Sequence, residues 1–220
     1  MKALLKLAAC LSVVLLVAGC ATPKRAAQDY TAFKQSKPRS ILVLPPLNES
    51  PDVAASYGML SQMTFPLAEA GYYVLPVALV NETFKQNGLS LPAEMHDASP
   101  AKLKDIFGAD AALYVTVTKY GTSYVVLDSI TTVAAKARLV DLRTGDVLWT
   151  GSASAASNEQ SNNASNGLLG MLITAAIKQI ANNVTDATFP IAGLASVRML
   201  SAGGPNGLLY GPHSPKYGTD

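Results

Sequence analysis

A cysteine that follows an apolar run and a few small residues, all near the start of the chain, limits what the rest of the chain can become. Lys2 and Lys6 come first, and the apolar run extends from Leu7 to Ala18. The residues directly before Cys20 are Leu16, Val17, Ala18 and Gly19. This order is typical of a signal peptide, residues 1–19, that ends in a lipobox and is removed when the cysteine is acylated. The run has about half of the roughly 20 residues in a membrane-spanning helix, so a permanent transmembrane anchor is the weaker alternative.

Cys20 supplies the thiol that takes the lipid in this interpretation. A second segment that matches the lipobox pattern, Leu7-Ala8-Ala9-Cys10, has almost no apolar sequence before it, so Cys20 is the preferred site of acylation. Each buried CH₂ group contributes about 0.8 kcal/mol, so two or three acyl chains hold a soluble domain at a membrane. Ala21, rather than aspartate, follows the cysteine, which predicts sorting to the outer membrane with the domain facing the periplasm. The diacylglycerol and N-acyl group on Cys20, the latter typically palmitate, are the only non-protein groups expected. No cofactor is expected.

Cleavage before Cys20 also settles the charge and the redox chemistry of the mature chain. It removes two lysines from a chain with 17 basic and 15 acidic residues, which leaves the two signs balanced. A neutral balance gives no reason to expect nucleic acid as a partner. Cys10 and Cys20 are the two cysteines of the chain, so the mature domain has neither a disulfide nor a cysteine-ligated metal. About 200 residues remain, enough for one domain with a well-buried core.

The mature chain divides into three parts. Residues 20–38 hold the lipidated cysteine and a polar tether, of which residues 29–33 are the part best suited to a helix. Residues 39–200 are predicted to form a single α/β domain. Residues 201–220 combine five glycines with three prolines, a composition that no regular element fits. Tyr210 and Tyr217, with two leucines, suggest that this tail lies along a surface, either its own or that of a neighbour.

The domain opens with a parallel strand–helix–strand unit. Residues 41–44, Ile-Leu-Val-Leu, form an apolar run closed by two prolines, which predicts a central strand buried on both faces. A helix is predicted to begin at Ser50-Pro51-Asp52, with Pro66 kinking or dividing it. Residues 72–77 are predicted to form the next strand. The order strand, helix, strand implies a right-handed crossover and a strand parallel to the first. Short helices are predicted at residues 80–86 and from Ser99-Pro100 to residue 107.

An antiparallel meander follows this unit. Residues 111–119 alternate apolar and polar side chains, and a second strand is predicted over residues 124–141. The turn at residues 143–146, Arg-Thr-Gly-Asp, leads into a third strand over residues 147–156. One face of this meander should be exposed to solvent. The predicted fold class is therefore α/β: a mixed central sheet, parallel at first and antiparallel afterwards, flanked by helices.

The most apolar stretch of the mature chain is Gly167 to Ile177. At 11 residues it is too short to span a bilayer. A helix buried against the sheet is the preferred interpretation. The alternative is a surface helix that contacts membrane or a partner through Leu168, Leu169, Met171 and Leu172, together with Tyr210 and Tyr217 of the tail.

No catalytic constellation is visible. His96 and His213 are far apart and lack other ligands at metal-binding spacing, so no metal site is predicted. Ser99 and Lys102 match a serine–x–x–lysine string, but the serine is better explained as a helix N-cap. The aspartates at 110, 128, 141 and 146 sit at predicted strand ends or turns, where aspartate serves the backbone. We expect that the chain is not an enzyme.

Three segments carry a family resemblance: Ser40 to Pro46, the Gly-Ala-Asp-Ala of residues 108–111, and the Val-Asp-Leu-Arg-Thr-Gly-Asp-Val-Leu-Trp of residues 140–149. With the lipobox, they resemble a family of Gram-negative lipoproteins of unknown function whose best-known member is a neisserial surface-antigen candidate. The chain is distantly similar to three other periplasmic domains: that of the curli secretion channel lipoprotein, the N-terminal domain of the Tol-Pal propeller protein, and the lipoprotein activators of peptidoglycan synthases. These resemblances imply protein contacts rather than catalysis.

The resulting expectation is a non-enzymatic outer-membrane lipoprotein that serves as an accessory subunit of an envelope assembly or export complex. Its partner would be a curli-channel-like lipoprotein or another secretion component, and a homodimer is left open. The alternative is a regulatory lipoprotein that activates a peptidoglycan-synthesising enzyme. A third class, an enzyme acting on a cell-wall or glycan substrate, would have to use Ser99, His96 and His213, the only catalytic candidates.

Overall fold

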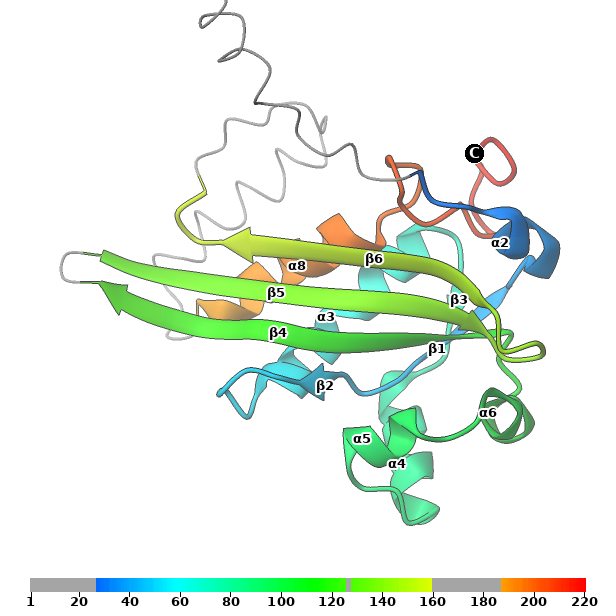
Figure 1. The fold of residues 1–220 in the computed structure, drawn as a ribbon, viewed down its shortest axis with the longest axis horizontal. Coiled ribbons are helices and arrows are strands. Elements are labelled where there is room, and N and C mark those ends of the chain that lie inside the picture. Colours follow the sequence, from blue (N-terminus) through cyan, green and yellow to red (C-terminus); the bar gives the residue numbers. More distant parts are fainter. Residues whose placement is uncertain (1–26, 126–127, 160–186) are drawn as a thin grey trace, which may run out of the picture.

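A computed structural model describes residues 27–125, 128–159 and 187–220. Within these ranges the chain forms one mixed six-stranded sheet with helices on both faces (Figure 1). The strands are β1 (Ser40–Val43), β2 (Leu47–Asn48), β3 (Tyr73–Val74), β4 (Ala111–Val125), β5 (Asp128–Asp141) and β6 (Val147–Ala156). The helices are α2 (Thr31–Ser36), α3 (Ala55–Glu69), α4 (Val77–Gln86), α5 (Pro92–His96), α6 (Pro100–Phe107) and α8 (Thr188–Leu200). The predicted fold class is confirmed.

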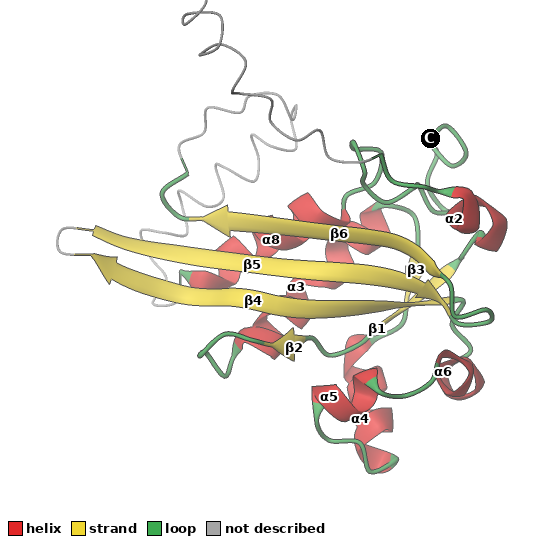
Figure 2. Cartoon of the chain, viewed as in Figure 1, coloured by secondary structure: helices red, strands yellow, loops and turns green. Residues whose placement is uncertain are grey.

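The strand order is β3-β1-β4-β5-β6, and β2 pairs with β4. β1 is parallel to both β3 and β4, whereas β4, β5 and β6 are antiparallel to one another. The central position predicted for the first strand is therefore correct, and Ile41, Leu42 and Val43 are fully buried. The long β4–β5–β6 meander extends well beyond the short parallel strands (Figure 2).

The two faces of the sheet are covered differently. On one face, α3 and α8 pack over the length of the meander and build the larger core, which includes Leu113, Val115, Val133 and Trp149. On the other face, α4, α5 and α6 cover only the end of the sheet near β1, around Leu42 and Phe84. The rest of that second face carries exposed polar side chains such as Lys136, Arg138 and Ser152. This is the wet face that the alternation predicted.

The first hairpin differs from the prediction in its limits. The sequence placed a break between residues 119 and 124, but β4 continues to Val125 and pairs with β5 throughout. A bulge between Val117 and Lys119 inserts one residue and reverses the alternation, so that Tyr120 is buried against the helices. Gly121 takes a φ of 133° inside the strand. This glycine therefore lies at an irregular position within the strand.

The long crossover helix also begins later than predicted. Asp52 Oδ1 accepts a hydrogen bond from the Ala54 amide at 2.8 Å, and α3 starts at Ala55. Ser50, the expected N-cap, instead donates its amide to Asn48 Oδ1 in the preceding turn. Pro66 lies in the last turn of α3 and does not divide the helix.

α8 is the helix that the sequence analysis missed. It buries Ile191, Ala195 and Met199, which recur at helical spacing, and it lies beside α3. Its signals were this spacing and Pro190 in the first turn. The predicted helix at residues 167–177 lies outside the described residues.

The Gly/Pro-rich tail packs on its own domain, which resolves the alternative left open for it. The Gly211 amide donates to Ala70 O at 2.8 Å, the His213 amide to Gly71 O at 3.0 Å, and the Tyr72 hydroxyl to Leu209 O at 2.5 Å. Leu208 is buried in the larger core. The tail is therefore part of the domain despite its composition.

Replacing Gly211 with alanine is expected to detach the tail, because a Cβ there would overlap the backbone of Gly71. We expect a loss of about 1–3 kcal/mol in the free energy of unfolding, the range for overpacking, measured by urea denaturation. Limited proteolysis should also cut the tail sooner. Gly204→Ala is the matched control, because a Cβ at that position meets nothing within 4 Å. Equal stability of the two variants would contradict the expectation.

Candidate functional site

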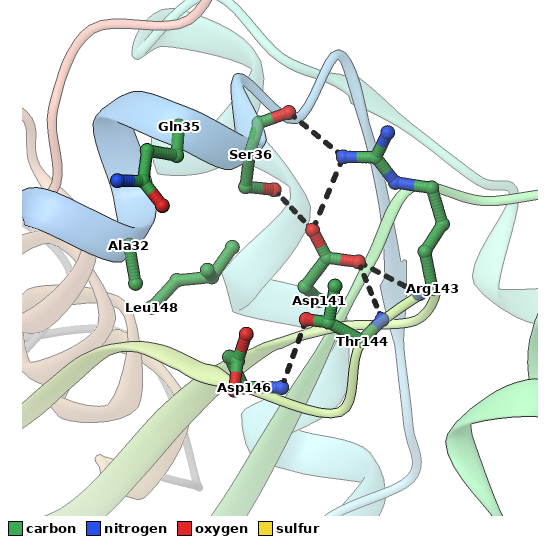
Figure 3. A pocket seen from close by; sticks show the side chains of 8 residues that line it. All are labelled: Ala32, Gln35, Ser36, Asp141, Arg143, Thr144, Asp146 and Leu148. Atoms are coloured by element: carbon green, nitrogen blue, oxygen red, sulfur yellow. Dashed lines mark hydrogen bonds and ion pairs between the residues drawn. The ribbon is translucent and has the colours of Figure 1, made fainter.

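The site with the most developed geometry lies where α2 meets the turn between β5 and β6. It is an open pocket of about 220 Å³ (Figure 3). The turn reverses the chain through Gly145, which has a φ of 81° and thus suits glycine. The residues that line the pocket are Ala32, Gln35, Ser36, Asp141, Arg143, Thr144, Asp146 and Leu148.

Asp141 is the centre of this site. Its side chain is almost fully buried, and both carboxylate oxygens accept hydrogen bonds. Oδ1 accepts from the amides of Arg143 (2.7 Å) and Thr144 (3.3 Å), and Oδ2 accepts from the Ser36 hydroxyl (2.5 Å) and Arg143 Nη2 (3.3 Å). Arg143 Nη2 also donates to Ser36 O at 3.1 Å, so the turn and α2 are joined twice.

The electrostatics of Asp141 indicate a structural role rather than a catalytic one. We call Asp141 and its partners Ser36, Arg143 and Thr144 the joint at Asp141. Burial is the largest influence and opposes ionisation, but the hydrogen bonds from Ser36, Arg143 and Thr144 together outweigh it and lower the pKa of this carboxyl. A carboxylate with a lowered pKa and saturated acceptors is a weak general base. Asp141 therefore holds α2 against the sheet.

The residues around α2 are held to the tail as well. The Gln28 amide donates to Asn206 Oδ1 at 3.0 Å, and the Tyr30 hydroxyl donates to Gly207 O at 2.6 Å. Phe33 is buried in the larger core. Residues 28–37 are thus packed on the domain, although the sequence assigned them to a tether. Phe33 and Tyr30 were the apolar signals within that polar segment.

Asp110 plays a similar part at the start of β4. Its Oδ2 accepts from the Arg39 amide at 3.0 Å and the Ser40 hydroxyl at 3.2 Å, and Lys104 Nζ lies 3.2 Å from Oδ1. Burial opposes ionisation most, but the Arg39, Lys104 and Ser40 donors lower the pKa of Asp110 on balance. The expectation that this aspartate serves the backbone is confirmed.

The catalytic candidates do not converge. Ser99 is the N-cap of α6, where its Oγ accepts from the Lys102 amide at 3.3 Å, as predicted. His96 ends α5 and lies edge-on to Tyr114, whereas the His213 backbone is bonded to Gly71. Among the residues that the structure describes, no group of three or more histidine, cysteine or acidic side chains could hold a metal ion.

His96 provides a pH dependence of stability. Burial lowers its pKa, and Arg138 lowers it further, against the opposing effect of the hydrogen bond to Pro45 O at 3.0 Å. The unfolded chain therefore takes up the proton at a higher pH than the folded chain does. The free energy of unfolding should fall as pH falls through about 6.5, the ordinary pKa of histidine. Urea titrations from pH 7.5 to 5 should show this slope. His96→Gln should flatten it, and the control variant His213→Gln should keep it.

Two of the other predicted contact residues, Tyr210 and Tyr217, lie within the described tail. Tyr210 is half-buried in its own tail, with its ring near Lys216 Nζ (5.5 Å) and its amide bonded to Asp220 Oδ2. Tyr217 is 48% exposed. Cys20, the lipobox residues 16–19 and the apolar residues 168, 169, 171 and 172 lie outside the described residues. None of the described helices is both long and apolar enough to cross a membrane.

The mixed sheet, the joint at Asp141 and the packed tail define an α/β domain whose N-terminal segment is attached to its own C-terminus. The chain belongs to the family described as “Putative lipoprotein GNA1162-like”, whose model matches residues 28–213. This confirms the resemblance that the sequence motifs indicated.

Two neisserial proteins support this assignment. A protein of Neisseria meningitidis serogroup B described as a “putative lipoprotein” is 55% identical over 202 residues, which are 92% of this chain and 93% of the relative. The crystal structure of lipoprotein GNA1162 from Neisseria meningitidis matches with a TM-score of 0.54 and 62% identity, over 66% of this chain and all of that one. The LpoB C-terminal domain from Salmonella enterica matches at a TM-score of 0.39 and 20% identity, over 53% of this chain and 81% of that domain.

Proposed function

We propose that this protein is a non-enzymatic outer-membrane lipoprotein, acylated on Cys20, whose periplasmic domain binds another envelope protein as an accessory subunit. The observation that carries the proposal is the attachment of residues 28–37 to the domain by Asp141, Asn206 and Gly207. Six residues separate Cys20 from Ala27, the first described residue. Even fully extended, this stretch spans at most about 25 Å. The domain is therefore held within about 25 Å of the lipid, where it can meet other proteins of the envelope.

Two of the polar residues considered as candidates for chemistry have structural roles. The buried carboxylate Asp141 is saturated by structural hydrogen bonds, and Ser99 is a helix cap. The membership of a lipoprotein family supports lipid attachment, and the lipobox in front of Cys20 supplies the chemistry. Leu168, Leu169, Met171, Leu172 and Tyr217 remain the proposed contacts to membrane or partner.

Acylation is tested by growing cells with a clickable palmitate analogue. We expect label on the wild type and on Cys10→Ala, the matched control, and no label on Cys20→Ala. The same membranes, separated on a sucrose gradient, should place the wild type in the outer membrane and move Ala21→Asp toward the inner membrane. Label that persists in Cys20→Ala would overturn this part of the proposal.

The partner is tested on the native acylated protein. In-cell crosslinking, mild-detergent purification and mass spectrometry should recover a second envelope protein reproducibly, and Cys20→Ala should lose it. Recovery of a peptidoglycan synthase would support the regulatory alternative, which a synthase assay with and without the domain then decides. Recovery of this protein alone would contradict the accessory role.

A further inference from the structure

The two helices that cover the meander are unusually poor in charge. Glu69, the last residue of α3, is the only charged residue in that helix, and Arg198 is the only one in α8. A surface helix of a soluble protein normally carries charged residues on its outer side. Burial in the core explains the apolar residues on the inner side of α3, where Met59, Met63 and Leu67 are fully buried. The outer side has no such explanation.

That outer side is both apolar and exposed. Tyr57 and Phe65 are 50% and 60% exposed, and Ser61 and Ala68 are exposed along the same side of the helix. We call these four residues the apolar helix face. Phe189 of the neighbouring α8 is 47% exposed as well. Large apolar side chains that are exposed on the same pair of helices can form a contact with protein or membrane.

The C-terminal tail links the start of the described chain to the end of α3. The Gln28 amide is bonded to Asn206 in the tail, and the tail is bonded through Gly211 to Ala70, which directly follows α3. Phe65 precedes Ala70 by five residues, or about one and a half helical turns. The 15 residues of α3 extend over about 22 Å. This length is comparable with the reach of about 25 Å available between Cys20 and Ala27.

We propose that the apolar helix face lies against the lipid bilayer to which Cys20 is attached. This inference rests on the proposed acylation of Cys20. A short anchor holds the face at the bilayer surface, so that even a weak contact becomes populated through its high effective concentration. Tyrosine suits this place because its ring is apolar and its hydroxyl stays wet. The four residues of the face carry no charge, and the one charge that borders it, Glu69, is acidic, so the contact should need neither low salt nor anionic lipid.

The test uses the native acylated protein carrying a single fluorophore. Cys10 leaves with the signal peptide and Cys20 is acylated, so Ser61→Cys introduces the only free thiol of the mature chain. Ser90→Cys, exposed in the loop between α4 and α5 on the other side of the sheet, is the matched control. Each variant is labelled with nitrobenzoxadiazole and reconstituted into phosphatidylcholine vesicles that contain spin-labelled lipid.

We expect several-fold stronger quenching by spin-labelled lipid at residue 61 than at residue 90. The difference should persist in high salt and when phosphatidylglycerol is added. Replacing Tyr57 and Phe65 by serine in the Ser61→Cys variant should abolish most of it. Both side chains are exposed, so the thermal unfolding midpoint should change little, whereas Leu79→Ser, exposed on α4, should leave the quenching unchanged.

Two results would overturn the inference. The first is equal quenching at residues 61 and 90. The second is protection of residue 61 from aqueous iodide without quenching by lipid, because a second copy of the chain, residues 167–177 of the same chain or another protein would then cover the face. Failure of acylation is distinguished from both, since the mass of the protein and vesicle flotation report it before any quenching is measured.

Discussion

Replacing Trp149 with alanine is expected to cost about 3–5 kcal/mol in the free energy of unfolding, the range for removing a large buried aromatic side chain. Trp149 lies on β6 in the larger core and is 1% exposed. Its Nε1 donates to Asn206 O at 2.9 Å, so the substitution also removes a bond that fixes the tail. Because Asn206 also accepts from the Gln28 amide, the N-terminal segment should loosen with the tail.

Urea denaturation followed by circular dichroism measures this loss, since the variant lacks the only tryptophan of the chain. Trp149→Phe is the control that keeps an aromatic ring but loses the hydrogen bond, and it should cost about 1–2 kcal/mol. Hydrogen exchange should show weaker protection of the Gln28 amide in both variants. A loss below about 1 kcal/mol for Trp149→Ala would contradict this account of the core.

The second large effect is expected at Asp141. Asp141→Ala should lower the free energy of unfolding by about 2–4 kcal/mol, because it leaves the Ser36 hydroxyl and the Arg143 and Thr144 amides without their acceptor. Asp141→Asn keeps the shape but places an amide where two donors converge, so it should lie between alanine and wild type. Asp146→Ala is the control: its side chain is exposed, and its amide bond to Thr144 is made by the backbone.

The pH dependence separates charge from shape at this joint. The folded pKa of Asp141 is lowered, so its contribution to stability is present above the ordinary aspartate value and is lost as pH falls through it. Below about pH 4, wild type should lose stability faster than Asp141→Asn. Parallel curves for the two proteins would show that the carboxylate charge contributes nothing to the joint.

The sequence predicts those elements of this fold whose periodicity is set by burial. The run from Ile41 to Val43 has no polar position, and only a central strand between two neighbours accommodates that. Ser99, Pro100 and Gly108 mark the ends of α6 because capping is local chemistry. The first hairpin could not be placed in the same way, since its bulge depends on Tyr120 reaching Gly58 of a different element.

The joint at Asp141 was harder to predict for a related reason. The turn at residues 143–146 can be predicted from the sequence, and an aspartate before it is expected. The hydrogen-bond partner of Asp141, Ser36, is 105 residues away. Likewise, the polar composition of residues 28–37 indicates a tether. No pattern in the sequence shows that Asn206 and Gly207 bond to this segment. Pairings between the two ends of a chain leave no local periodicity.

Those pairings between residues 28–30 and 206–207 also affect the order in which the domain folds. The Gln28 amide bonds a residue 178 positions later, and the Tyr30 hydroxyl one 177 positions later. Contacts of such long range form late, because the intervening chain must first be ordered. With Cys20 acylated as proposed, a variant that lacks the tail would keep its lipid but lose the bonds that fasten residues 28 and 30 to the domain.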